Sequence, residues 1–133
     1  CEGVNNHMGS LATTDEDVMN AVMATLKKYN KFYLDSRTTN VSVAYSIAQK
    51  NHLRSYRNDL FLDSPNISQS TMDAKLNQII ELSNRNQNVI AITHCHNSDK
   101  LDYLKRIISR LKAAGFTLIP LTDIDKYNVP TIL

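Results

Sequence analysis

Apolar residues recur along the chain in two alternating patterns. In four segments they lie three or four residues apart, which is the spacing of an amphipathic helix: residues 14–29, 41–50, 68–85 and 99–114. Short apolar runs between these segments fit buried strands: a brief approach to Asn5, then residues 32–34, 53–57, 89–93 and 116–120. Strands that alternate with helices in this way predict an α/β fold with a parallel sheet.

Polar and turn residues mark the ends of these elements. Thr14 followed by Asp17 is close to a capping box at the start of the first helix. Gly115 follows the last helical segment, where we expect it to adopt the left-handed conformation of a helix cap. Residues 60–62 are apolar, and we expect them to anchor the loop that Pro65 then interrupts.

Composition narrows the class of protein. A chain of 133 residues with 42% hydrophobic and 21% charged residues fits one folded domain. The net charge is +2 and the basic residues are scattered among acids, which excludes a nucleic-acid-binding stripe. No apolar run approaches the roughly 20 residues that span a bilayer, so no membrane span is predicted.

Ionisable and hydrogen-bonding residues follow several of the predicted strands. The carboxyl ends of parallel strands lie at one edge of a sheet, so we expect these side chains to gather there. The set is His7, Asp35, Arg37, Arg57, Asp59 and His94. Such a pocket could bind an anion or a metal and carry out acid–base chemistry on a polar substrate. The chain has no glycine-rich dinucleotide or phosphate loop and no G-x-S-x-G elbow.

Each candidate also has a structural interpretation. Asp35 with Arg37 could be an ion pair that closes a loop, and for Arg57 and Asp59 the structural interpretation is preferred. His94 is the strongest functional candidate, because it ends the clearest predicted strand.

A metal site is a separate hypothesis. Zinc would need two or three imidazoles and a carboxylate, leaving one position for water. The chain has no H-E-x-x-H, H-x-x-x-H or C-x-x-C motif, so His7, His94 and Asp35 would have to assemble the site from distant strands. His7 alone could equally be a hydrogen-bonded structural residue.

Several motifs together resemble the divergent polysaccharide deacetylase family. The most specific is the string G-V-N-N-H-M-G-S at residues 3–10. The others are F-Y-L-D-S-R-T at 32–38, S-V-A at 42–44, R-N-D-L-F-L-D at 57–63, A-I-T-H at 91–94 and L-I-P-L at 118–121. Their order and spacing agree with the family over nearly the whole chain.

The resemblance implies a fold, an activity and a set of site residues. The fold would be an irregular (β/α) barrel, and the activity the hydrolysis of N- or O-acetyl groups on a carbohydrate, with a divalent metal such as zinc activating water. His94 matches a late-strand histidine that assists the leaving group, His7 is the metal candidate, and Asp35 and Arg37 are the other catalytic candidates. The substrate-binding candidates are Asn5, Asn6, Ser36, Arg57 and Asp59. An extracytoplasmic location is suggested by the resemblance alone.

The sequence departs from the family pattern in two ways, and these determine what we expect of the isolated chain. The family's first strands, which carry an Asp-Asp pair and a histidine motif, have no counterpart here, and Thr93 and Cys95 flank His94 where glycine and proline are usual. We therefore expect residues 1–133 to be a single partial domain, the C-terminal part of the barrel without its N-terminal strands. Alone it should be inactive, needing the missing half, a partner chain or self-association to cover its strand edges. The alternative is a non-catalytic carbohydrate-binding or interaction module on the same fold.

Overall fold

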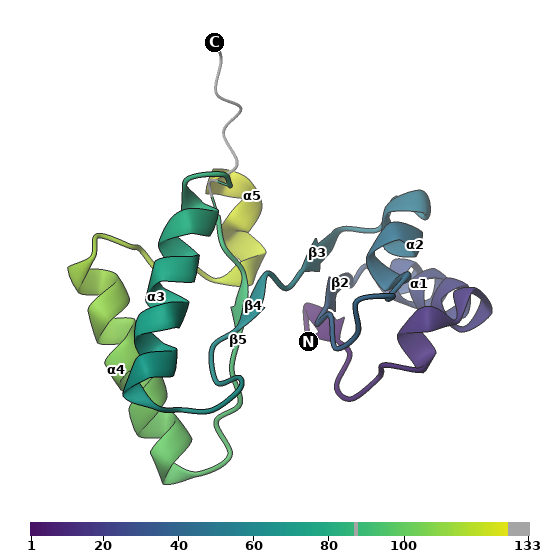
Figure 1. Ribbon diagram of the computed structural model, residues 1–133. Helices are drawn as coiled ribbons and strands as arrows, with labels where there is room; N and C mark the ends of the chain where they lie inside the picture. Colours follow the sequence, from purple (N-terminus) through teal and green to yellow (C-terminus); the bar gives the residue numbers. More distant parts are fainter. Residues whose placement is uncertain (87, 128–133) are drawn as a thin grey trace. The chain divides into compact units, whose positions relative to one another are not determined.

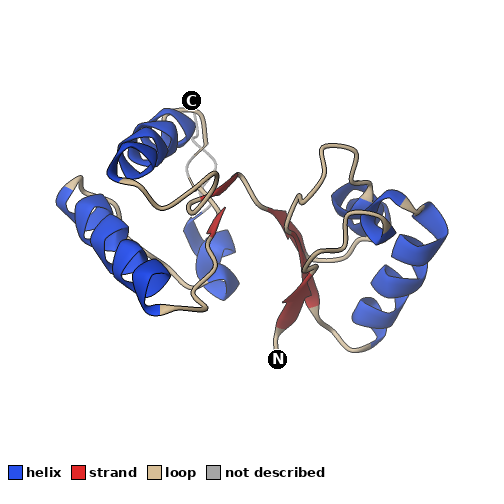
Figure 2. Ribbon diagram, turned by 60° about the horizontal axis from the view of Figure 1, so that its bottom comes forward, coloured by secondary structure: helices blue, strands red, loops and turns tan. Residues whose placement is uncertain are grey.

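The computed structural model describes residues 1–86 and 88–127. They divide into two compact units, Cys1–Asn58 and a second unit that begins at Asp59. Figure 1 labels the elements of each unit, and Figure 2 distinguishes the short strands from the helices and loops that surround them.

The first unit is built on a three-stranded parallel sheet. Its strands β1 (Gly3–Asn5), β2 (Phe32–Asp35) and β3 (Ser55–Arg57) lie in that order, with Asn5 beside Leu34 and Asp35 beside Arg57. The connections contain η1 (Ala12–Thr14), α1 (Glu16–Lys28) and α2 (Ala44–Lys50). The core joins both α-helices to the sheet through Met19, Met23, Tyr33, Ala44, Ile47, Ala48 and Leu53.

Helix α1 starts one residue later than the expected capping box. Asp15, not Thr14, is its N-cap: a carboxylate oxygen accepts hydrogen bonds at 3.0 Å from the backbone N–H groups of Asp17 and Val18. Thr14 instead ends η1, where its hydroxyl donates to the Leu11 carbonyl at 2.8 Å. The prediction of Thr14 as the cap is wrong because its hydroxyl already bonds within the preceding turn.

The second unit pairs two short parallel strands with two long helices. Strand β4 (Leu60–Phe61) pairs with β5 (Ala91–Ile92), and α3 (Gln69–Ser83) packs with α4 (Ser98–Ala113) around Met72, Leu76, Ile79, Tyr103 and Ile107. The described part of the chain ends in η2 (Leu121–Asp123) and α5 (Ile124–Tyr127).

Three strand predictions change in this unit. Residues 60–62 were expected to anchor a loop, but two of them form β4. The strand expected over residues 89–93 is shorter and less covered, because β4 offers only two residues to pair and Ala91 is exposed. Residues 116–120 form no strand in the described chain, since Phe116 instead closes α4 and packs on its core.

Three helices end in the same left-handed turn. After α4, the Gly115 N–H donates to the Lys112 carbonyl and the Phe116 N–H to Leu111, both at 3.0 Å, and Gly115 has φ 88°, as predicted. The same pair of bonds closes α1 and α2, but there the left-handed residues are Asn30 (φ 51°) and His52 (φ 53°). Neither residue has the freedom of glycine, so both positions carry backbone strain.

The prediction of an α/β fold with parallel strands is confirmed, since all three strand pairings are parallel. Neither sheet closes into a barrel within the described residues. None of the helices in residues 1–86 and 88–127 is long and apolar enough to cross a membrane.

Candidate functional site

Polar side chains of the first unit gather where its strands end, and of the six residues predicted to meet there this cluster includes Asp35. Three asparagine side chains bond to Ser36, the residue that follows β2. The Asn6 Oδ1 accepts from the Ser36 N–H at 2.8 Å, the Asn5 Nδ2 donates to the Ser36 hydroxyl at 3.0 Å, and the Asn58 Nδ2 donates to its carbonyl at 3.2 Å. The amides therefore fix the turn after β2, while Asn5 itself stays exposed.

Asp35 is the buried acid of this cluster. It is 2% exposed and accepts two hydrogen bonds at 2.8 Å, from the Arg37 N–H and from the Ser42 hydroxyl. Asp35 thus binds the backbone of Arg37, whose side chain is exposed and whose φ is 51°. Burial and the Asp35 charge raise the pKa of Tyr33 above its ordinary range, so its hydroxyl stays protonated and donates to Asn6 at 3.0 Å. These contacts order the loop; the catalytic role of Asp35 and Arg37 stays a prediction.

The remaining strand-end candidates do not share one cluster. His7 is exposed in the loop after β1, and the Arg57 guanidinium lies 5.5 Å from the centre of the Tyr45 ring. Asp59 belongs to the second unit, where its carboxylate accepts from the Ile90 N–H at 2.8 Å and so supports the β4–β5 pairing.

The metal prediction can be compared with the donors present. Among the residues that the structure describes, no three histidine, cysteine, aspartate or glutamate side chains gather into a group that could hold an ion. The described residues therefore do not fit a complete zinc site, zinc stays a prediction, and no step below is derived through a metal.

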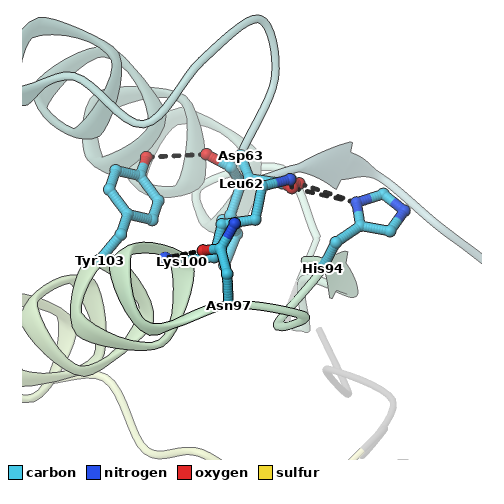
Figure 3. A network of polar contacts seen from close by, with 6 residues as sticks. All are labelled: Leu62, Asp63, His94, Asn97, Lys100 and Tyr103. Carbon is cyan, nitrogen blue, oxygen red and sulfur yellow. Dashed lines mark hydrogen bonds and ion pairs between the residues drawn. The ribbon is translucent and has the colours of Figure 1, made fainter.

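In the second unit, the buried carboxylate of Asp63 forms hydrogen bonds with the side chains of His94 and Lys100 (Figure 3). Asp63 follows β4, His94 follows β5, and Lys100 lies in the first turn of α4. The Asp63 Oδ2 accepts from the Lys100 Nζ at 2.6 Å and lies 3.0 Å from the His94 Nδ1. The Asp63 side chain is only 3% exposed, whereas those of Lys100 and His94 are 22% and 42% exposed. The Phe61 ring stacks on the imidazole, with ring centres 6.1 Å apart and planes 5° from parallel.

The charge state of this network follows from its contacts. Burial by itself would raise the pKa of Asp63, but the hydrogen bonds and positive charges of Lys100 and His94 outweigh it and hold the pKa below its usual range. Asp63 is therefore a carboxylate at neutral pH. Burial and that charge raise the pKa of Tyr103, whose hydroxyl donates to the Leu62 carbonyl at 2.8 Å and fixes the end of β4.

The arrangement orients the imidazole for proton transfer. A carboxylate can only accept hydrogen bonds, so the Nδ1–H of His94 donates to Asp63 and any proton exchange by the ring takes place at Nε2. In Figure 3 this second nitrogen points away from Asp63. The sequence pointed to His94 but missed Asp63 and Lys100. The available signal was an apolar run, residues 60–62, that ends in an acid.

Comparison with known protein families shows which family the sequence matches. The family model for divergent polysaccharide deacetylases matches residues 1–124. The chain belongs to this family. This confirms the resemblance inferred from the motifs. Asp63 and His94 both lie within the residues that the family model matches.

Relatives with similar sequences come from bacteria. An uncharacterized protein of Haemophilus influenzae is 38% identical over 92 residues, which cover 69% of this chain and 32% of that protein. The uncharacterized protein YibQ of Escherichia coli is 38% identical over 96 residues, covering 71% of this chain and 29% of the relative. The chain thus spans about a third of the length of these curated relatives.

A solved structure shows the same fold. The crystal structure of the uncharacterized protein ATU2773 from Agrobacterium tumefaciens C58 matches with a TM-score of 0.74 at 19% identity, over 86% of this chain and 45% of that one. At this identity the similarity speaks for the fold alone.

Proposed function

We propose that this chain contributes to a carbohydrate deacetylase, a hydrolase that removes acetyl groups from sugars, and that it forms the C-terminal part of an irregular (β/α) barrel. The observation that carries the proposal is the partly exposed His94 bound through Nδ1 to the buried carboxylate of Asp63, in a member of the divergent polysaccharide deacetylase family. The strands pair in parallel, as the strands of such barrels do, which supports this part of the proposal.

His94 would act on the departing sugar. Hydrolysis adds water to the acetyl carbonyl carbon, and the bond to the sugar nitrogen or oxygen then breaks as that atom takes up a proton. The Nε2 of His94 would supply this proton, and the proton that the attacking water releases would restore the ring. This is general acid catalysis worth about 10²–10⁴ in rate. The Asp63 carboxylate stabilises the protonated ring and keeps its orientation, as in other histidine–carboxylate pairs.

Lys100 and Tyr103 would support the pair without touching substrate. Lys100 shares an oxygen of Asp63 with His94, so it keeps this carboxylate charged and fixed in position. Tyr103 holds the Leu62 carbonyl one residue before Asp63. Both are positioning residues.

Most of the predicted sugar-binding residues lie in the first unit. Of the predicted binding set, Asn5 and Arg57 are exposed: the Asn5 Oδ1 could accept a hydrogen bond from a sugar hydroxyl, and the Arg57 guanidinium could donate to hydroxyl or acetyl oxygens. Asn6 and Ser36 are mostly engaged within the loop after β2, so their effect on binding would come through the shape of that loop.

Acetate release from an acetylated oligosaccharide tests the proposal, using protein expressed from the complete coding sequence. We expect His94→Gln to lower the rate at least about 100-fold, the usual effect of losing a general acid. His96→Gln is the matched control, since His96 is a neighbouring exposed histidine with no place in the network, and its rate should equal that of the unmodified protein. Equal rates for both variants would refute the role of His94. Glycan binding without acetate release would favour the binding module.

The 133-residue chain by itself should release no acetate, because we propose that the strands missing from it complete the barrel. Acetate release by this purified chain would overturn the partial-barrel proposal while leaving the role of His94 to the variant test.

A further inference from the structure

A cavity lies in the first unit, at the opposite ends of the strands from Asn6 and Asp35. Its volume is about 740 Å³, and it is lined by residues that end α1, begin β2 and precede β3. The residues that matter are Glu2, Lys27, Lys31, Phe32, His52 and Arg54. We call this space the basic cavity.

Positive charge predominates around the basic cavity. Three cations, from Lys27, Lys31 and Arg54, face the single carboxylate of Glu2. Within the described part of the chain, neither Lys27 nor Lys31 takes part in an ion pair. The Lys27 Nζ is held by the Asn51 carbonyl at 2.9 Å, which fixes the ammonium group at the cavity wall.

The guanidinium of Arg54 is positioned by aromatic rings. It lies 5.8 Å from the centre of the Phe32 ring and 5.5 Å from that of Tyr56, and its Nε donates to the Tyr56 hydroxyl at 2.6 Å. These contacts hold the guanidinium in place at the cavity, where its positive charge adds to those of the two lysines.

The need to stabilise the C-terminal ends of α1 and α2 explains only part of the positive charge around the basic cavity. Lysines at the end of α1 complement the helix dipole, which accounts for Lys27. The carbonyls near the ends of α1 and α2 already accept backbone bonds, at 2.9 to 3.1 Å, from Asn30, Lys31, His52 and Leu53. Lys31 and Arg54 are therefore not required to satisfy those carbonyls, and the left-handed His52 adds a fourth basic side chain at a strained position.

We propose that the basic cavity binds a small phosphorylated organic molecule, of about the size of a sugar phosphate. The charge matches a dianionic phosphate group, which takes hydrogen bonds from arginine and lysine. The volume lies in the range of about 300–1,000 Å³ that is typical of small-ligand sites. Within the first unit the cavity is distinct from the predicted sugar-binding residues, because it lies where β2 begins at Phe32 and not where the strand ends at Asp35.

Calorimetric titration of the protein at low ionic strength, with three probes, tests this proposal. Glucose 6-phosphate should bind saturably and more tightly than inorganic phosphate, and neutral glucose should not bind. Phosphate binding as tightly as glucose 6-phosphate would show a simple anion site and overturn the organic part of the proposal. No saturable binding of either anion would overturn it entirely.

Two lysine variants test whether glucose 6-phosphate binds in the basic cavity. Lys31→Met should weaken glucose 6-phosphate binding about tenfold, the effect of losing one charged hydrogen bond. Lys28→Met is the matched control: it removes the same charge nearby, but Lys28 packs against Tyr29 outside the cavity lining. Equal losses in the two variants would show that binding follows net charge and would refute the site. Circular dichroism of both variants checks that the fold is retained.

Discussion

Replacing Asp63 by asparagine removes the charge at the centre of the second unit's network while keeping the size of the side chain. In the native protein the Asp63 Oδ2 accepts from the Lys100 Nζ at 2.6 Å and lies 3.0 Å from the His94 Nδ1. An asparagine oxygen is a weaker acceptor, and its NH₂ group would face donors instead of accepting from them. We therefore expect both a loss of stability and a freer imidazole.

The exposure of the partners sets the size of this loss. A hydrogen bond to a charged group contributes about 1.5–3 kcal/mol, and an ion left buried without its partner costs about 3–5 kcal/mol. The Lys100 and His94 side chains are 22% and 42% exposed, so both can recover water when the carboxylate is gone. We expect Asp63→Asn to lower the free energy of unfolding by about 2 kcal/mol, toward the bottom of these ranges.

Urea unfolding followed by circular dichroism, at neutral and acid pH, measures this difference. The folded-state pKa of Asp63 is lowered from 3.8, so its contribution is complete above that unfolded-state value and is lost as the pH falls through the folded value. The gap between native protein and variant should be full at neutral pH and should close in stronger acid. Asp102→Asn is the control, because its pair with Lys105 is well exposed on both sides and should leave stability unchanged.

Two results would refute this reasoning. A gap that persists unchanged in strong acid would show that packing, and not charge, causes the loss. Equal stability of Asp63→Asn and native protein at neutral pH would show that Lys100 and His94 gain nothing from the carboxylate. In either case the proposed orientation of His94 would lose its support.

Three further predictions concern backbone strain and alkaline pH. His52→Gly should stabilise the protein by about 1 kcal/mol in thermal unfolding, by relieving a left-handed φ of 53°; a loss instead would mean that the His52 side chain stabilises the fold. Gly115→Ala should cost about 1 kcal/mol, because φ is 88° and no atom within 4 Å of the added Cβ could compensate; an unchanged midpoint would contradict the role of the left-handed cap. Since the folded-state pKa of Tyr33 is raised above 10.0, its contribution is complete below that unfolded value and is lost as the pH rises toward the folded one. An ultraviolet titration should show one fewer late-ionising tyrosine in Tyr33→Phe than in the native protein; an equal number of late-ionising tyrosines in the two proteins would refute this assignment.

Periodicity predicted the helices because each buries one face against a single core. The segment 99–114 became α4, with Tyr103, Ile107 and Leu111 inward. The strands were harder to predict, because a two-residue strand is defined by the strand with which it pairs and not by its own sequence of apolar and polar residues. Residues 60–61 became a strand through pairing with Ala91 and Ile92, whereas residues 116–120 have equally apolar character but Phe116 is taken up by the end of α4.

In the candidate site, too, contacts between residues distant in the sequence could not be predicted from local patterns. Two apolar runs in this sequence end in an acid, residues 32–35 and 60–63, and in both cases the acid is buried. The donors to Asp35 lie two and seven residues further along the chain, so a local pattern suffices to suggest that it orders a loop. His94 and Lys100 lie 31 and 37 residues from Asp63, and they reach it only once β4 and β5 are paired and α4 follows. The acid in the first run thus has local partners and a structural role that sequence can anticipate. The acid in the second run has distant partners, and it is this long-range pairing that orients the imidazole of His94.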